Sequence, residues 1–183
     1  MAWLRTIMTA CVLAVPALAQ DAPKAPVSPE SPEPPMTYER LGRILFALDE
    51  NAQPAGTGFQ LSISGVPVLI VTDQAADRMR AMVPLRPAEG LTAEDMMRMM
   101  QANFDTALDA RYAVAKGRLW AVFIHPLSPL EKDQLISSLG QTVNIARTYG
   151  TLYTGGALQF GGGDSPGIQR QLIEELLEKG EEI

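Results

Sequence analysis

The spacing of hydrophobic residues changes several times after residue 36, and each change predicts a new element. Spacing is helical over 37–49, where the apolar positions are Leu41, Ile44, Leu45 and Leu48. Alternating residues and β-branched runs follow, which predict three strands, at 59–64, 66–72 and 77–84. Thr37 is the expected N-cap of the helix, because its hydroxyl is suited to accept from an amide of the first turn.

A stretch rich in Pro and Gly over 84–90 separates these strands from a second helix. Thr92 and Asp95 open this helix as a capping-box-like pair, and its apolar spacing runs to about Ala107. A hairpin is predicted next, with its two strands and its turn at 111–115, 118–124 and Lys116-Gly117.

The segment Ser128-Pro129-Leu130-Glu131 is the strongest local signal in the chain. It combines a residue suited to an N-cap, a Pro suited to the first helical position and a Glu three residues after the Ser. We therefore expect Ser128 to cap a third helix that ends near Gly150. Ser165-Pro166 predicts the start of a last amphipathic helix over 165–179.

The order of these elements, α-βββ-α-ββ-α, predicts an α+β domain with an antiparallel sheet and helices packed mainly on one face. The C-terminal amphipathic helix is an addition to that core. We expect the domain to span 36–150, and a Gly-rich hinge with an acidic amphipathic helix to span 151–183.

The N-terminal part of the chain predicts export. Residues 1–19 are typical of a signal peptide, with Arg5, an apolar run and Ala17-Leu18-Ala19 before the expected cleavage site. The run is short for a bilayer span, so we expect no membrane span after cleavage and a periplasmic or secreted protein. An uncleaved anchor, a lipoprotein modified at Cys11 and a cytoplasmic protein that starts at Met36 are the alternatives.

Residues 20–35 form a Pro-rich linker in this interpretation. Five of its prolines recur at every third position, which is the period of the polyproline II helix and predicts a stiff, extended spacer. A docking peptide for a Pro-binding groove is the alternative.

Composition narrows the chemistry that the domain can perform. The chain has 15 Lys and Arg against 21 Asp and Glu, and this net charge of −6 argues against nucleic acid as a partner. It has one Cys, inside the predicted signal peptide, and one His, which is a poor set for zinc. We therefore expect no cofactor, no metal and no catalytic residues.

Three groups of residues are candidate functional sites. The cluster Met96, Met97, Met99 and Met100 favours core or interface packing over Cu(I) binding, because thioethers fill irregular apolar spaces well. His125 ends an apolar strand without a nucleophile motif beside it, so a structural role is expected. Asp105 and Asp109 are four residues apart near a helix end, where a solvated face is expected rather than acid–base chemistry.

Residues 99–139 resemble YbjN-like domains and type III secretion chaperones of the Tir chaperone family. The helix end Met99-Met100-Gln101-Ala102-Asn103-Phe104 is similar to the Leu-Leu-x-Ala-Asn-hydrophobic pattern of these families. The strand Leu119–Ile124 and the connection Pro126–Leu130 extend the likeness, and the general pattern covers about 36–149. The resemblance implies a small α+β domain, often homodimeric, that binds protein segments and has no catalytic residues. Export and residues 150–183 depart from the family pattern.

Two predicted strands, 66–71 and 118–124, are apolar on both faces, so both faces require burial. A second copy of the chain or a bound protein segment is expected to cover the face that the helices leave open. Folding of the C-terminal helix onto that face is the alternative. The expected partner or dimer surface consists of the sheet face and the Met-rich helix, namely Leu69, Val71, Met96, Met100, Phe104, Trp120, Val122 and Ile124.

The sequence thus predicts an exported, non-enzymatic protein-binding domain, chaperone-like or regulatory, that holds an apolar polypeptide segment as a homodimer. The alternative is a small exported enzyme or ligand-binding protein. Its site would be assembled from scattered residues such as Asp109, Arg111 and His125.

Overall fold

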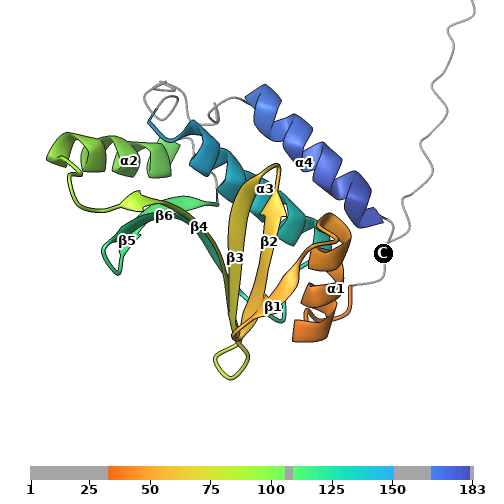
Figure 1. The fold of residues 1–183 in the computed structure, drawn as a ribbon. Helices are drawn as coiled ribbons and strands as arrows, with labels where there is room; N and C mark the ends of the chain where they lie inside the picture. The colour runs from red at the N-terminus through yellow and green to blue at the C-terminus, as the bar shows by residue number, and fades with distance from the viewer. Residues whose placement is uncertain (1–32, 106–108, 151–165, 182–183) are drawn as a thin grey trace, which may run out of the picture. The chain divides into compact units, whose positions relative to one another are not determined.

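The computed structural model describes residues 33–105, 109–150 and 166–181. The predicted signal peptide, all but the last residues of the Pro-rich linker and the Gly-rich hinge lie outside these ranges. The helices and strands are α1 (Tyr38–Leu48), β1 (Gln53–Ala55), β2 (Gly58–Ile63), β3 (Val66–Asp73), β4 (Arg78–Pro87), α2 (Ala93–Asp105), β5 (Arg111–Ala115), β6 (Arg118–Pro126), α3 (Lys132–Thr148) and α4 (Pro166–Glu181) (Figure 1). The α+β class is confirmed.

The six strands form one antiparallel sheet in the order β1-β2-β3-β4-β6-β5. The short edge strand β1 was missed by the sequence analysis, because its three residues include Pro54 and carry no alternating pattern. The three long strands, β3, β4 and β6, lie next to one another in the middle. Figure 1 shows that the sheet is strongly twisted, so that β2 and β3 cross the direction of β5 and β6.

The helices gather on one face of this sheet. Helix α3 packs across β3, β4, β5 and β6, whereas α1 contacts β2 and α2 contacts β5. The inward residues of the strands are the apolar alternates that the sequence predicts, Phe59, Leu61, Ile63, Val68, Ile70, Met79, Ala81, Val83, Leu119, Ala121 and Phe123, and all are buried. The opposite face of the sheet, which we call the open face, carries the remaining alternates.

Helix α4 adds a further layer on top of α3. It contacts α3 and α1 within the compact unit Glu33–Ile183. Glycines permit the close approach, because a Cβ on Gly140 would lie 2.7 Å from Cγ1 of Ile173, and one on Gly180 would lie 2.4 Å from Cδ1 of Ile136. The alternative in which the C-terminal helix covers the open face is therefore wrong.

Being packed on two sides, α3 buries polar residues as well as apolar ones. Ser138, Thr142 and Thr148 are buried, and each hydroxyl donates to the carbonyl oxygen four residues earlier, at 2.7–2.8 Å. These bonds within the helix provide each buried hydroxyl with an acceptor. A low-hydrophobicity helix thus lies in the centre of the domain.

Two of the predicted helix starts are confirmed, and the strongest signal is wrong. Thr37 caps α1 by accepting from the amide of Arg40 at 3.2 Å. Thr92 and Asp95 bond reciprocally, each side chain accepting from the other's amide at 3.0 Å. Ser128, however, does not cap α3, which begins at Lys132 after Glu131.

Ser128 is instead bound by a residue distant in sequence. Its amide and its hydroxyl both donate to the carboxylate of Asp77, each at 2.7 Å. The first turn of α3 finds its acceptor in Glu33, whose carboxylate accepts from the Lys132 amide at 3.0 Å. Tertiary partners have thus replaced the local capping box.

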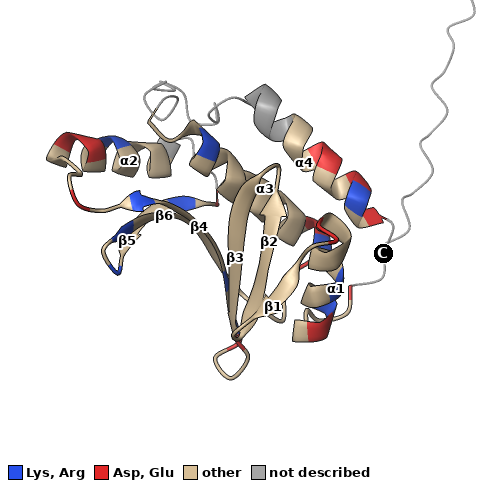
Figure 2. Cartoon of the chain, viewed as in Figure 1, with Lys and Arg blue, Asp and Glu red and all other residues tan. Residues whose placement is uncertain are grey.

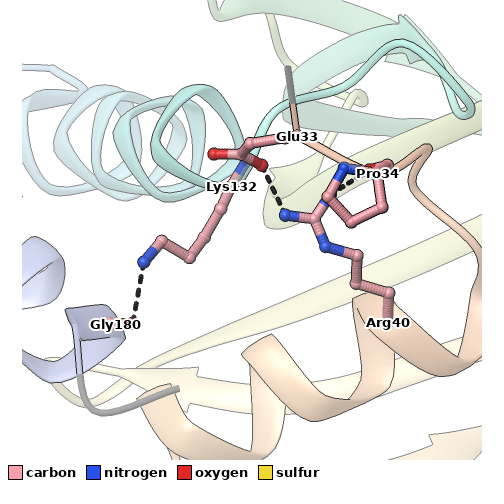
Figure 3. A network of polar contacts seen from close by, with 5 residues as sticks. All are labelled: Glu33, Pro34, Arg40, Lys132 and Gly180. Carbon is pink, nitrogen blue, oxygen red and sulfur yellow. Dashed lines mark hydrogen bonds and ion pairs between the residues drawn. The ribbon is translucent and has the colours of Figure 1, made fainter. Parts of the chain in front are cut away.

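The same carboxylate of Glu33 joins a network that links the start of the domain to three helices (Figure 3). Arg40 of α1 pairs with Glu33 through its guanidinium and also donates to the carbonyl of Pro34. Lys132 of α3 extends its ammonium to the carbonyl oxygen of Gly180 in α4, at 3.1 Å. The start of the domain, α1, α3 and the end of α4 are therefore tied together by polar contacts.

Within the described ranges, no helix is both long and apolar enough to cross a bilayer.

Candidate partner-binding surfaces

The open face of the sheet presents a continuous set of apolar side chains across its central strands. The strand register aligns Leu69 of β3, Met82 of β4 and Val122 of β6 as direct neighbours. In the next row, Val71 and Ile124 stand on either side of Arg80. Val71 is 44% exposed and Ile124 is 54% exposed, so no helix of the described chain covers this row.

Trp120 extends the apolar surface toward the β5–β6 hairpin. It lies opposite Pro84 on one side and Ala113 on the other. Its side chain is partly exposed, and its indole Nε1–H donates to the carbonyl of Ala115 at 3.0 Å. The polar atom of the ring is therefore satisfied within the hairpin, which leaves the carbocyclic part for apolar contact.

Most charged residues on the outward strand positions of the open face are arginines. Arg78, Arg80, Arg111 and Arg118 occupy outward positions of β4, β5 and β6, and Asp73 at the end of β3 is the acidic residue among the outward strand positions. Asp73 lies opposite Arg78 in the register. In Figure 2, Lys and Arg mark the β4–β6–β5 part of the sheet, whereas Asp and Glu are concentrated on the helices and turns.

A second apolar surface is formed by α2 and the β5–β6 hairpin on the helical side of the sheet. Met99 of α2 is buried, whereas Met96, Met97 and Met100 are 45%, 61% and 55% exposed. A groove of about 250 Å³ lies beneath them, lined by Met96, Met99, Met100, Tyr112, Ala113, Val114 and Leu119. The thioethers are therefore part of an apolar groove.

The eight residues singled out from the sequence lie on these two surfaces. Leu69, Val71, Trp120, Val122 and Ile124 belong to the open face. Met96 and Met100 belong to the groove, and Phe104 is 74% exposed near the end of α2. The sheet face and the Met-rich helix lie on opposite sides of the sheet, because α2 packs on the side of Leu119, opposite to Trp120. Their use as a partner or dimer surface stays a prediction.

Two residues of the open face were not named from the sequence. Met82 joins Leu69 to Val122, and Arg80 divides Val71 from Ile124. Both lie on the polar alternate of the strand 77–84, which the sequence analysis took to face solvent. The alternation in this strand shows that both residues face outward. It does not show that they lie next to residues of β3 and β6, because that depends on the order of the strands in the sheet.

The structure does not bring together the scattered residues of the alternative site. Arg111 faces the open side and donates to the carbonyl of Ala110, whereas His125 is on the helical side, stacked on Phe123 at 5.7 Å. The amide of Asp109 donates to the side chain of Gln141 at 2.9 Å. The sheet therefore separates Arg111 from His125, while Asp109 and His125 lie against different parts of α3, at Gln141 and Gln134.

Other candidates of the sequence have ordinary surroundings. His125 Nδ1 lies 2.8 Å from the carbonyl oxygen of Pro126, which agrees with a structural role. The side chain of Asp105 lies outside the described atoms, so its pairing with Asp109 stays untested. Within the described residues, no group of three or more His, Cys, Asp or Glu side chains is placed to hold a metal ion.

Comparisons with known proteins give a distant likeness only. No protein-family model and no curated protein matches the sequence. Among the solved structures that match is a chain from "Structure of the HopA1-SchA Chaperone-Effector Complex", with 14% identity and a TM-score of 0.44. The match covers 60% of this chain and 92% of that one.

Proposed function

We propose that this chain is an exported, non-enzymatic protein-binding domain that holds an apolar polypeptide segment against the open face of its sheet. The observation that carries the proposal is the partly exposed row Leu69, Met82 and Val122, continued by the exposed Val71 and Ile124. A contiguous apolar patch in the middle of a sheet is costly in water, which favours a face that a partner covers.

The chemistry of the face supports a polypeptide over a small metabolite. The rows run across three neighbouring strands, and Val71 and Ile124 are 44% and 54% exposed, whereas small-molecule sites are concave and surround most of their ligand. The resemblance of residues 99–139 to YbjN-like and secretion-chaperone domains favours the same conclusion. A chaperone-like or regulatory role is therefore proposed.

A matched pair of substitutions tests the use of this face. Ile124 and Val114 are both 54% exposed and belong to the same hairpin, but they face opposite sides of the sheet. Binding of a fluorescein-labelled Leu-rich peptide is measured by anisotropy. Ile124→Asp is expected to weaken it roughly tenfold, because about 1 kcal/mol of apolar burial is lost and a carboxylate is desolvated. Val114→Asp is expected to bind as the parent chain does, and equal loss in both variants would refute the proposal.

The competing proposal is a small exported enzyme or ligand-binding protein. Native mass spectrometry of the purified chain distinguishes it, because a retained small molecule would add a defined mass. Retention of such a molecule, with no peptide binding by the parent chain, would favour the alternative.

We further propose that the domain is a homodimer formed through α2. Met97 and Met100 are three residues apart, exposed and uncharged, so the same stripe of a second copy can pack against them about a twofold axis. The open face is less suited to self-association, since its arginines would meet their own copies. Light scattering coupled to size exclusion is expected to show a dimer that Met97→Asp dissociates, and a monomer at micromolar concentration would contradict this assignment.

Export is proposed from the sequence of residues 1–19. Arg5, the apolar run and Ala17-Leu18-Ala19 support cleavage after Ala19. Mass spectrometry of the mature N-terminus is expected to find Gln20 first. An intact N-terminus on the cytoplasmic side would contradict a periplasmic or secreted location.

A further inference from the structure

We infer that the segment held on the open face is acidic as well as apolar. This inference rests on the proposed function and names the chemistry of its partner. The open face mixes apolar residues with guanidinium groups, and a segment that presents carboxylates among apolar side chains is its complement.

Arg80 lies between two exposed apolar side chains of the open face, and this position favours an acidic partner. Arg80 lies in the middle strand, with Val71 as its neighbour on β3 and Ile124 as its neighbour on β6. Strands are about 4.8 Å apart, so the guanidinium rises from between two exposed apolar side chains. A ligand that covers Val71 and Ile124 must also cover Arg80, and leaving that charge buried without a partner would cost affinity.

Two further arginines lie next to the apolar rows. Arg111 on β5 pairs with Val122 in the register, at the end of the row that begins at Leu69. Arg118 stands at the hairpin, two positions before Trp120 on the same face of β6. The cations are therefore placed around and within the apolar surface.

These arginines have no acidic partner in the described part of the chain. The ion pairs found there are Arg40 with Glu33 and Arg98 with Glu94, neither of which lies on the open face. Asp73 lies opposite Arg78, beyond the row of Arg80. A basic face on a chain of net charge −6 marks a local segregation of charge, which is a feature of surfaces that recognise anionic groups.

Polypeptide fits this face better than the other anionic partners. Nucleic acid binding without base-specific contacts uses several stacking aromatics along a basic groove, and Trp120 is the aromatic residue on the outward positions of β3, β4, β5 and β6. A second copy would bring Arg80 and Arg111 against like charges. An acidic, apolar segment instead satisfies both components of the surface.

The test uses three labelled peptides of the repeat Leu-Ser-X-Ser, in which X is Glu, Gln or Lys. In an extended peptide, Leu and X share one side, since side chains alternate along a strand. Anisotropy titrations of the purified chain are expected to rank the peptides Glu, then Gln, then Lys. Raising the salt from about 50 to 500 mM is expected to reduce the difference between Glu and Gln, because the pairs are screened.

Two variants assign that preference to the face. Arg80→Gln is expected to weaken binding of the Glu peptide about threefold, and Arg80→Gln with Arg118→Gln about tenfold, while binding of the Gln peptide changes less. Arg43→Gln is the matched control, since Arg43 is an exposed arginine of α1 beside the groove that Glu33 and Lys132 line. It is expected to leave all three affinities unchanged.

The outcomes separate this inference from the proposed function. If the Glu and Gln peptides bind equally and Arg80→Gln has no effect, the acidic preference is wrong while apolar binding stands. If no peptide binds, the proposed function itself fails. Binding of a single-stranded oligonucleotide or of phosphatidylglycerol vesicles as tight as that of the Glu peptide would also overturn the inference, because a general anion surface would then explain the data.

Discussion

The carboxylate of Asp77 accepts two hydrogen bonds from Ser128, one from its amide and one from its hydroxyl, each 2.7 Å long. Asp77 lies in the β3–β4 turn with a φ of 50°, and its carbonyl accepts from the amide of Leu127 at 3.1 Å. The turn is therefore fastened to the connection between β6 and α3, and this fixes the end of the strand pair that carries Arg80 and Ile124.

Removing this link is expected to destabilise the domain. Asp77→Ala loses both acceptor oxygens and places an unsuited residue at positive φ, so its Tm is expected to be well below that of the parent chain. Asp77→Asn keeps an acceptor and tolerates that φ, so its loss is expected to be smaller. Thermal unfolding by circular dichroism measures both Tm values. An equal Tm for the two variants would contradict a stabilising role of the acceptor that Asp77→Asn retains.

Stability is expected to fall in acid. The pKa of Asp77 is below its ordinary value of 3.8 because the hydroxyl and the amide of Ser128 stabilise its charge. The pKa of Asp49 is lowered mainly by the Ser62 amide, and that of Glu33 mainly by Arg40. A lowered folded-state pKa means that the unfolded chain binds more protons, so this stabilisation is present above the unfolded pKa and is lost as pH falls through the folded one.

The Tm is therefore expected to be level above about pH 5 and to decrease below about pH 4. Asp77→Asn removes one of the titrating groups, so its Tm is expected to depend less on pH over that interval. A parent chain whose Tm is unchanged down to pH 3 would contradict the assignment.

Asn103 is expected to matter for the junction of α2 and β5. Its side chain makes two bonds with the backbone of Tyr112, accepting from the amide at 2.7 Å and donating to the carbonyl at 3.1 Å. Asn103→Ala leaves both backbone groups without this partner and is expected to cost about 1–3 kcal/mol of unfolding free energy. Urea denaturation measures the change, and Gln101→Ala, an exposed site on the same helix, is the control that should be nearly neutral.

The docking of α4 on α3 gives a prediction about Gly140. A Cβ there would lie 2.7 Å from Cγ1 of Ile173, so Gly140→Ala is expected to lower the unfolding free energy by about 1–3 kcal/mol in spite of its higher helix propensity. Ile173→Ala removes the clashing carbon. The double variant is therefore expected to lose less than the sum of the two single losses, and strict additivity in denaturation would show that the two residues do not interact.

Much of the fold was predictable from the sequence because strands such as β4 alternate buried apolar residues with exposed ones. Met79, Ala81 and Val83 are buried while Arg78 and Arg80 are exposed, as the alternation indicates. The hairpin and the helix starts at Thr37 and Thr92 depend on neighbours within a few residues, so local pattern suffices for them.

Features that depend on long-range contacts could not be predicted from the local pattern. Ser128 had a suitable local cap position, but Asp77, 51 residues away, offers it two bonds. Likewise, α3 is covered on its outer side by α4, which packs at Ile136 and Gly140, and this docking depends on a helix distant in sequence. The partition of the site residues between two surfaces depends on which side α2 packs, which periodicity within a strand or a helix does not specify.

The brevity of β1 has a consequence for assembly. An unpaired edge strand invites another chain to extend the sheet, and proteins oppose this with short edges and with proline. Here the edge strand is three residues long and includes Pro54, so it offers few backbone groups for pairing with a strand of another chain. Recognition by side chains across the sheet is thereby favoured over growth of the sheet into fibres, even though the protein exposes apolar strands.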